Sequence, residues 1–243
     1  MIVIPMAGLS RRFQEAGYPV PKYMLEAGGR SLFAHSVLSF EAYFDSLPFL
    51  FIYRDVQGTD AFVRAEAARV GIRDARFVVL EAPTLGQADT VWQGLTRSGA
   101  DRDAPITVFN IDTVRPGFRF PGADVMDSAG YLEVFRGEGD NWSFVGPAPD
   151  QPGRVARTTE KDPISDLCSD GLYHFAHAGS FTDAYEAALD AQDATRGEYY
   201  IAPLYNRLIA AGLDIRYAVV PREDIVFSGV PAEYEAFRAQ LES

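Results

Sequence analysis

The sequence predicts one α/β domain with a mixed, mainly parallel sheet flanked by helices. Short apolar runs alternate with longer segments of helical periodicity through roughly the first 110 residues, the order typical of a parallel sheet. The 243 residues are 47% hydrophobic and 23% charged, the balance of a globular protein with a substantial core. We found no repeat, low-complexity tract or clear linker, so we predict a single domain over residues 1–243, with halves at 1–113 and 114–243.

The first half contains four predicted strands and three predicted helices. An apolar run ends at Met6, directly before a loop of Gly, Ser and Arg, which indicates a buried first strand. Ser31 is a favourable N-cap, and Leu32, His35 and Phe40 follow it at helical spacing. The predicted strands cover 2–6, 49–53, 77–80 and 106–111, and the predicted helices cover 31–43, 59–70 and 86–95.

The second half consists of shorter strands separated by Gly, Pro and Asp, followed by helices. We expect it to complete the sheet and to build the other side of a cleft. The predicted strands cover 131–135, 142–145, 155–160, 172–175 and 215–220, and helices are predicted at 181–191, 200–211 and from Pro231 onward.

Charge and cysteine content exclude several classes of function. The formal net charge of -12 repels polyanions, so nucleic acid is not expected as a partner, although a few local cations can still bind a small anion. The single cysteine, Cys168, rules out an intrachain disulfide and is expected to be a buried apolar residue. The N-terminus does not resemble a signal peptide, and no apolar run reaches the ~18 residues needed to cross a bilayer. The expectation is a cytoplasmic protein without a membrane partner.

The segment from Pro5 to Phe13, followed by Pro21-Lys22, has the composition of a phosphate-binding loop. Gly8 comes directly after the predicted first strand, where a glycine lets backbone N–H groups approach an anion. Arg12 and Lys22 add the fixed positive charges that a triphosphate needs. The segment matches neither a Walker A loop nor a Gly-x-Gly-x-x-Gly fingerprint.

This loop, Ala7-Gly8-Leu9-Ser10-Arg11-Arg12-Phe13 with Pro21-Lys22, resembles the signature of the sugar-phosphate nucleotidyltransferases. That family includes glucose-1-phosphate thymidylyltransferases, uridylyltransferases and phosphocholine cytidylyltransferases. The resemblance implies the Rossmann-like nucleotide-diphospho-sugar transferase fold. It also implies that residues 1–113 bind the nucleotide and 114–243 the acceptor, with Ala7, Gly8, Leu9 and Ser10 on the nucleotide and Arg12 and Lys22 catalytic. Ser10 stands where many members have a second glycine.

Two further segments fit the same interpretation. Asp112 ends a strongly apolar strand, at the edge where parallel sheets place ligands, and Mg²⁺ prefers such oxygen ligands. By resemblance, Asp112 holds a catalytic Mg²⁺, and Gly86 and Gln87 contact the base. The family usually supplies a second metal aspartate near its C-terminus, but this chain has Phe227 or Ser228 there. Nearby Glu223 and Asp224 are the alternatives that the sequence offers.

On the acceptor side, resemblance implies that Glu160 binds hydroxyls and Lys161 binds the phosphate, with Gly171 and Glu198 framing the pocket. Adjacent strand residues point to opposite faces, so Glu160 and Lys161 reach one ligand only if the segment bends. His174 and His177 are three residues apart on a predicted strand, which argues against a shared metal.

Together these patterns predict a Mg²⁺-dependent nucleotidyltransferase that joins a nucleoside triphosphate to a small phosphorylated acceptor, foremost a sugar 1-phosphate, and releases pyrophosphate. The resemblance also suggests a part in nucleotide-sugar and polysaccharide biosynthesis. A glycosyltransferase of the same fold and an inactive nucleotide-binding relative remain as alternatives. The base, the acceptor and the oligomeric state are left open.

Overall fold

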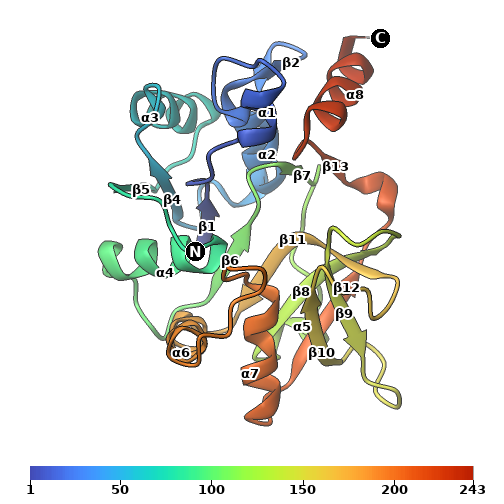
Figure 1. The fold of residues 1–243 in the computed structure, drawn as a ribbon. Helices are drawn as coiled ribbons and strands as arrows, with labels where there is room; N and C mark the ends of the chain where they lie inside the picture. The colour runs from blue at the N-terminus through green and yellow to red at the C-terminus, as the bar shows by residue number, and fades with distance from the viewer. Residues whose placement is uncertain (243) are drawn as a thin grey trace.

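A nine-stranded sheet forms the centre of the protein in the computed structural model, which describes residues 1–242 (Figure 1). Its strand order is β10-β9-β11-β6-β1-β4-β5, and β8 lies between β11 and β12. The nine strands are β1 (Ile2–Pro5), β4 (Phe49–Arg54), β5 (Ala75–Leu80), β6 (Ile106–Phe109), β8 (Gly130–Arg136), β9 (Ser143–Pro147), β10 (Val155–Glu160), β11 (Leu167–Phe175) and β12 (Ile215–Val219).

The first half of the chain builds the parallel part of this sheet, as predicted. β1 pairs in parallel with both β4 and β6, and β4 pairs in parallel with β5. The chain therefore leaves β1 on one side and returns to it on the other at β6. Ligands of such sheets bind outside the carboxyl ends of the strands at this reversal of strand order.

The second half extends the same sheet through β11. This strand pairs antiparallel with β8 along one edge, and its other edge pairs antiparallel with β6 near its end and with β9 at Cys168; all nine of its residues are buried. Cys168 lies on it, and burial raises the pKa of this thiol to about 11, so it stays protonated at neutral pH. The predicted α/β fold is confirmed, and the second half shares the sheet of the first.

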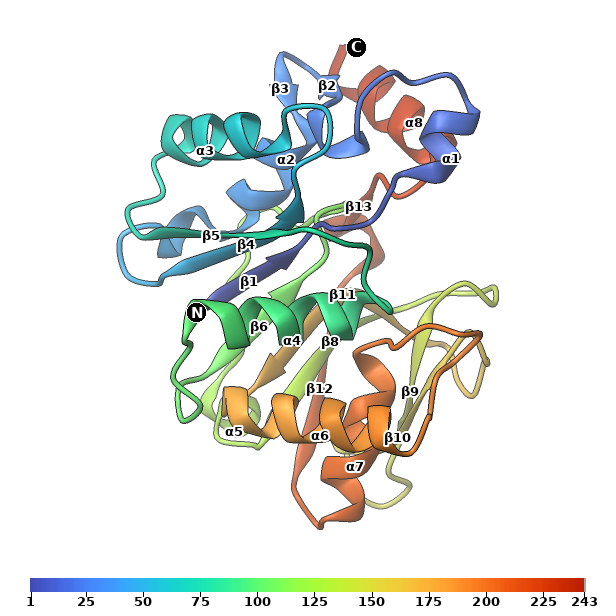
Figure 2. The ribbon, with the colours of Figure 1, turned by 60° about the vertical axis from the view of Figure 1, so that its left-hand side comes forward.

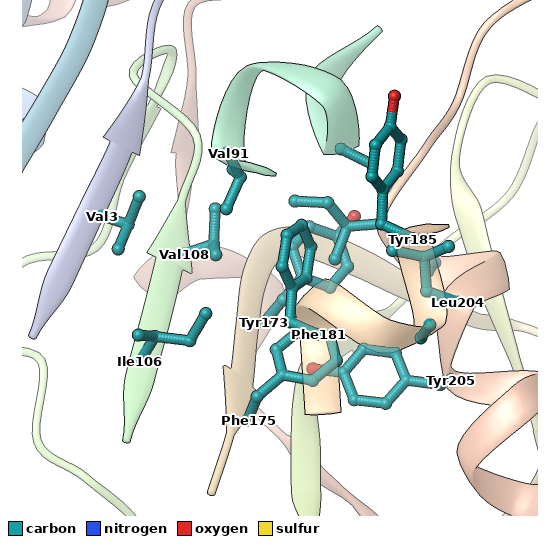
Figure 3. Packing of buried hydrophobic residues seen from close by; sticks show 14 of the residues in the cluster. Val3, Val91, Ile106, Val108, Tyr173, Phe175, Phe181, Tyr185, Leu204 and Tyr205 are labelled. Carbon is teal, nitrogen blue, oxygen red and sulfur yellow. The ribbon is translucent and has the colours of Figure 1, made fainter. Parts of the chain in front are cut away.

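Helices cover both faces of the sheet (Figure 2). They are α1 (Arg11–Glu15), α2 (Leu32–Val37), α3 (Thr59–Val70), α4 (Gln87–Ser98), α5 (Ala123–Met126), α6 (Ala178–Asp190), α7 (Tyr205–Ala210) and α8 (Pro231–Glu242). One apolar core lies between the sheet and α2 and α3, and the other lies between the sheet and α4, α6 and α7. In the second core the rings of Phe175 and Tyr205 stack at a centroid distance of 4.4 Å (Figure 3). No helix within residues 1–242 is long and apolar enough to span a bilayer.

Short elements that the sequence did not predict determine how the ends of the sheet are covered. The helix predicted from 31 to 43 ends at Val37 and continues as a 3₁₀ turn, because Phe40 leaves helical backbone angles. The unpredicted short strands are β2 (Glu26–Ala27), β3 (Arg30–Ser31), β7 (Thr113–Val114) and β13 (Val226–Phe227). β13 pairs with β7, which brings the C-terminal segment beside the end of β6.

Candidate active site

Two adjoining cavities, of about 460 and 490 Å³, open at the carboxyl ends of β1 and β6. The first is lined by the loop after β1 and the turn before α4, and the second by β9, β10, β11 and the segment before α8. Gln87, Asn110 and Asp112 line both cavities and therefore lie at their junction. A ligand that fills both cavities passes these three side chains.

The predicted nucleotide loop lines the first cavity with all four of its residues, Ala7, Gly8, Leu9 and Ser10. Ser10 has φ +52° and ψ +35°, in the left-handed region that glycine adopts at little cost. Its hydroxyl oxygen accepts a hydrogen bond of 3.2 Å from the backbone N–H of Lys22. Ser10 thus occupies the glycine position of the signature in a glycine-like conformation, and it connects the loop to Lys22.

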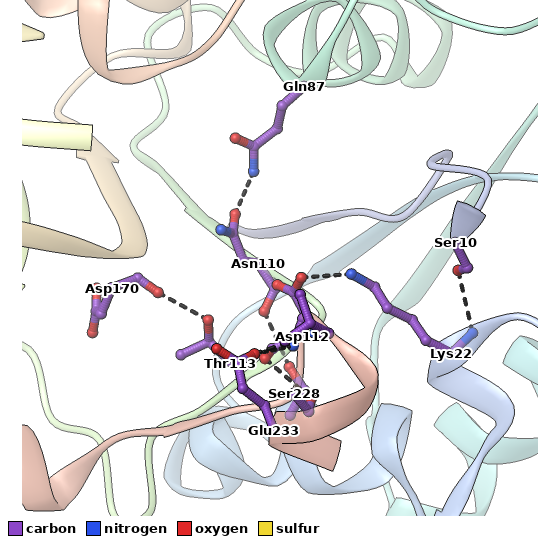
Figure 4. Close-up of polar contacts among 12 residues, drawn as sticks. Ser10, Lys22, Gln87, Asn110, Asp112, Thr113, Asp170, Ser228 and Glu233 are labelled. Carbon is purple, nitrogen blue, oxygen red and sulfur yellow. Dashed lines mark hydrogen bonds and ion pairs between the residues drawn. The ribbon is translucent and has the colours of Figure 1, made fainter. Parts of the chain in front are cut away.

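Lys22 and Asp112 form an ion pair at the junction of the cavities, with 2.5 Å between Lys22 Nζ and Asp112 Oδ2 (Figure 4). Lys22 begins a 3₁₀ turn after Pro21, and Asp112 follows β6. Burial alone would raise the pKa of Asp112, but the nearby charges of Lys22 and Arg12 outweigh it and lower the pKa. The carboxylate is therefore anionic and faces cations.

The two arginines of the loop lie on different sides of Asp112. Arg11 lines the first cavity, whereas Arg12 lines the second, and both belong to the exposed part of α1. The structure therefore places the predicted catalytic Arg12 at the second cavity and not at the first.

The turn before α4 joins the two halves of the protein. Gly86 has φ +131°, and a Cβ at this position would lie 2.5 Å from the backbone oxygen of Tyr199. Two backbone hydrogen bonds cross here, from Tyr199 N–H to the Leu85 oxygen at 2.8 Å and from Ala88 N–H to the Tyr199 oxygen at 3.0 Å. This close approach explains why a glycine is required at position 86.

Gln87, predicted to contact the base, donates a hydrogen bond to the side-chain oxygen of Asn110 at the junction of the cavities (Figure 4). Gly171, predicted on the acceptor side, supports the same Asn110. Its φ is +96°, and a Cβ there would lie 2.3 Å from Asn110 Nδ2. Both predicted residues therefore help to place one amide between the cavities.

Asp89, which the sequence pattern did not indicate, supports the turn before α4. Its buried carboxylate accepts hydrogen bonds from the Leu85 N–H at 2.8 Å and from the Tyr185 hydroxyl at 2.9 Å. An acidic residue in the first turn of a helix is common, so its spacing alone gave no reason to single it out.

The predicted Glu160-Lys161 pair stays together, with 3.8 Å between Lys161 Nζ and Glu160 Oε1, but only Glu160 lines the second cavity. Glu160 lines the second cavity and accepts a hydrogen bond from Ser143, and burial raises the pKa of its carboxyl group. Lys161 has φ +55°, so the chain does bend here, but its ammonium lies 4.3 Å from the centre of the Tyr200 ring. The Tyr200 hydroxyl in turn donates to Glu198, which lines the first cavity.

An aromatic wall in the second cavity was not predicted. Trp142 and Phe227 both line the cavity, with ring centroids 4.8 Å apart, and the guanidinium of Arg222 lies 4.8 Å from the centre of the Phe227 ring. Such a wall suits the apolar face of a small ring-shaped ligand.

The C-terminal segment is bound directly to Asp112. The backbone N–H and the hydroxyl of Ser228 both donate to the backbone carbonyl oxygen of Asp112, at 2.8 and 3.1 Å. Glu233, in the first turn of α8, lines the second cavity together with Asp112. Glu223 and Asp224 line neither cavity, and Asp224 lies 3.9 Å from Arg115 instead.

A buried polar cluster that the sequence did not indicate adjoins the second cavity, which Asp170 also lines. Glu133 pairs with Arg115 at 2.7 Å, and Asp170 is buried beside it. Burial and the carboxylate of Glu133 raise the pKa of Asp170 well above its usual value. An ionised Asp170 would thus lie beside the charge of Glu133, which Arg115 offsets.

A parallel sheet with a phosphate loop after β1 and an ion pair between two cavities defines a nucleotide-binding transferase. Comparison with protein-family models found no match, and comparison with curated proteins found none either. Among solved structures, the nucleoside-diphosphate-sugar pyrophosphorylase from Vibrio cholerae RC9 is 53% identical, with a TM-score of 0.94 over 99% of this chain and 100% of that one. The chain therefore belongs to the sugar-phosphate nucleotidyltransferase family, as its loop predicted.

More distant structures share the fold. A putative glucose-1-phosphate thymidylyltransferase from Bacillus anthracis is 15% identical, with a TM-score of 0.75 over 100% of this chain and 94% of that one. The inositol-1-phosphate CTP transferase from T. maritima is 12% identical, with a TM-score of 0.71 over 100% of this chain and 95% of that one.

Proposed function

We propose that this protein transfers a nucleoside monophosphate from a nucleoside triphosphate to a sugar phosphate, and releases pyrophosphate. The observation that carries the proposal is the Lys22–Asp112 pair at the junction of the two cavities. The nucleotide occupies the first cavity, between the loop after β1 and the turn at Gly86. The acceptor occupies the second, so the reacting phosphates meet at the junction.

An oxygen of the acceptor phosphate attacks the α-phosphorus, and the bond to the pyrophosphate leaving group breaks. The acceptor phosphate is already ionised at neutral pH, so no side chain has to remove a proton. The protein contributes position and charge. Backbone N–H groups of Gly8 to Ser10 hold the triphosphate, and Lys22 moves from Asp112 to the reacting phosphates.

The donor set at the junction fits a magnesium ion. Asp112 offers a hard, anionic oxygen, and the ammonium of Lys22 already occupies a cation position 2.5 Å from it. When bound, Mg²⁺ would neutralise charge on the phosphates. Asp112 would hold it, while Arg12 neutralises charge from the acceptor side.

The second cavity supports a sugar phosphate as acceptor. Glu160 offers a carboxylate to hydroxyl groups, while Trp142 and Phe227 offer an aromatic face to the ring. Because its substrates would be nucleoside triphosphates and metabolic phosphates, we place the enzyme in the cytoplasm, in the supply of nucleotide sugars for polysaccharide synthesis.

The test is a pyrophosphate-release assay with Mg²⁺, five nucleoside triphosphates and a panel of sugar phosphates and phosphocholine. Release that requires one triphosphate and one acceptor is expected. Lys22→Ala and Asp112→Ala should each lower kcat by about 100-fold or more, since each removes charge stabilisation at the reacting phosphates. Arg102→Ala, which removes an exposed ion pair with Asp183, is the matched control. Near-wild-type turnover of both site variants would refute the proposal.

A further inference from the structure

Glu233 lies across a small gap from Asp112. A Cβ built on Gly229 would lie 3.0 Å from Asp112 Oδ2 and 3.5 Å from Glu233 Oε2. The two carboxylates therefore lie against the same glycine and come from different elements, the end of β6 and the start of α8. Figure 4 shows Asp112 and Glu233 side by side. A side chain at position 229 would come between them, and glycine leaves their approach unobstructed.

The hydrogen bonds of Glu233 account for only one of its two oxygens. The backbone N–H groups of Gly229 and Val230 both donate to Oε2, at 2.8 and 3.2 Å. This is the usual arrangement of a glutamate that caps its own helix. Oε1 accepts none of the hydrogen bonds found within residues 1–242. The carboxylate therefore has a free oxygen beside the second cavity, which it lines.

Hydrogen bonds to the chain around Asp112 fix the position of the segment that precedes α8. Ser228 donates both its N–H and its hydroxyl to the backbone oxygen of Asp112, and β13 pairs with β7 directly before it. Asp112 and Glu233 are thus held at one place by a part of the fold that the sequence did not predict. Lys22 pairs with Asp112 at 2.5 Å, whereas Glu233 has no ion-pair partner within residues 1–242.

We propose that Glu233 is the second protein ligand of the divalent cation held by Asp112, in place of Glu223 or Asp224. This inference rests on the proposed function, because the remaining ligands of a Mg²⁺ ion here are substrate phosphate oxygens and water. Glu233 lines the second cavity and the loop after β1 lines the first, so a cation bound by Asp112 and Glu233 would neutralise charge where the two cavities meet.

The experiment measures cation binding directly. Mn²⁺ is titrated into the full-length protein with saturating inorganic pyrophosphate, and free Mn²⁺ is followed by electron paramagnetic resonance. Glu233→Gln keeps an acceptor for the N–H groups of Gly229 and Val230 but removes the charge, so the helix cap is retained. We expect it to weaken Mn²⁺ binding by about 10- to 100-fold, the range seen when a supporting metal-site carboxylate is lost.

Two further variants separate a ligand from a structural residue. Gly229→Ala keeps both carboxylates but places a methyl group at the point between them, and it should weaken Mn²⁺ binding as well. Asp224→Asn, the matched control, removes one carboxylate that lies 3.9 Å from Arg115 outside the cavities and should leave binding unchanged. Thermal melting of each variant checks that the fold is intact.

Equal Mn²⁺ affinity of Glu233→Gln and the wild type would overturn the inference, since Glu233 would then only cap α8. An equal loss of Mn²⁺ affinity in Asp224→Asn would overturn it too, because the loss would then follow from removing any nearby negative charge. If Glu233→Gln binds Mn²⁺ as tightly as the wild type and the wild type releases pyrophosphate, the proposed function stands and the role of Glu233 does not. If Mn²⁺ binding depends on Glu233 and no substrate pair turns over, the cation site stands and the proposed function does not.

Discussion

Replacing Gly86 by alanine should break the contact between the turn before α4 and the backbone of Tyr199. A non-glycine residue at φ +131° and ψ -176° carries about 1–3 kcal/mol of strain. The added Cβ would lie 2.5 Å from the Tyr199 oxygen and 2.7 Å from its nitrogen, and these backbone atoms cannot turn away as a flexible side chain can. Moving them breaks two backbone hydrogen bonds of about 1 kcal/mol each. We therefore expect the free energy of unfolding to fall by about 3–5 kcal/mol.

The measurement is urea-induced unfolding of both proteins, followed by circular dichroism. Gly99→Ala is the matched control, because Gly99 also has a positive φ, +64°, but a Cβ there would meet no atom within 4 Å. Its free energy of unfolding should fall only by the strain of a non-glycine residue at positive φ, about 1–2 kcal/mol. If Gly86→Ala loses no more than Gly99→Ala, the backbone of Tyr199 can yield, and the argument from close approach is wrong. Nucleotide affinity, measured by calorimetry at low temperature, should fall for Gly86→Ala alone.

Three other variants test separate parts of the structure. Burial lowers the pKa of His174 to about 4 from 6.5, so the unfolded chain binds an extra proton between these values. Stability should therefore fall by about 3 kcal/mol as the pH drops through this range, and unfolding of His174→Gln at pH 7 and pH 4 should lack this loss. Asp170→Asn should leave the free energy of unfolding at pH 8 unchanged or higher, because it removes a buried carboxyl that repels Glu133 when ionised. A large decrease of this free energy in urea unfolding would instead show that Asp170 is ionised and paired. Glu160→Gln should raise the KM of the acceptor about tenfold with little change in the KM of the triphosphate, since its carboxylate lines only the second cavity. Initial rates with each substrate varied in turn measure both values, and an equal rise of both would contradict this prediction.

Local patterns in the sequence predicted the sheet and most of the residues that line the first cavity. The buried runs of β1, β4 and β6 are read from apolar residues alone, and their order implies the edge at which Asp112 lies. The loop residues and Asp112 lie close in space because they follow adjacent strands. Lys22 joins them through a 3₁₀ turn and the hydroxyl of Ser10, which the sequence pattern did not specify.

The acceptor side was less predictable because long-range packing determines it. Lys161 is next to Glu160 in sequence, but its left-handed backbone lets its ammonium donate to Tyr200, thirty-nine residues away, while it stays 3.8 Å from Glu160. Glu233 lies beside Asp112 only because β13 pairs with β7 over a separation of more than one hundred residues. No local spacing contains that information. The same holds for Trp142 and Phe227, which come from distant segments.

The position of β11 has a consequence for synthesis of the chain. The edge of β6 that faces away from β1 is covered only by β11, which follows it by some sixty residues. Until Phe175 has left the ribosome, the nascent chain presents Ile106–Phe109 as an open apolar edge, the kind of strand that pairs with other chains. Nascent chains arrested before Leu167 should therefore recruit chaperones or aggregate, whereas the same chains extended past Phe175 should close the sheet themselves.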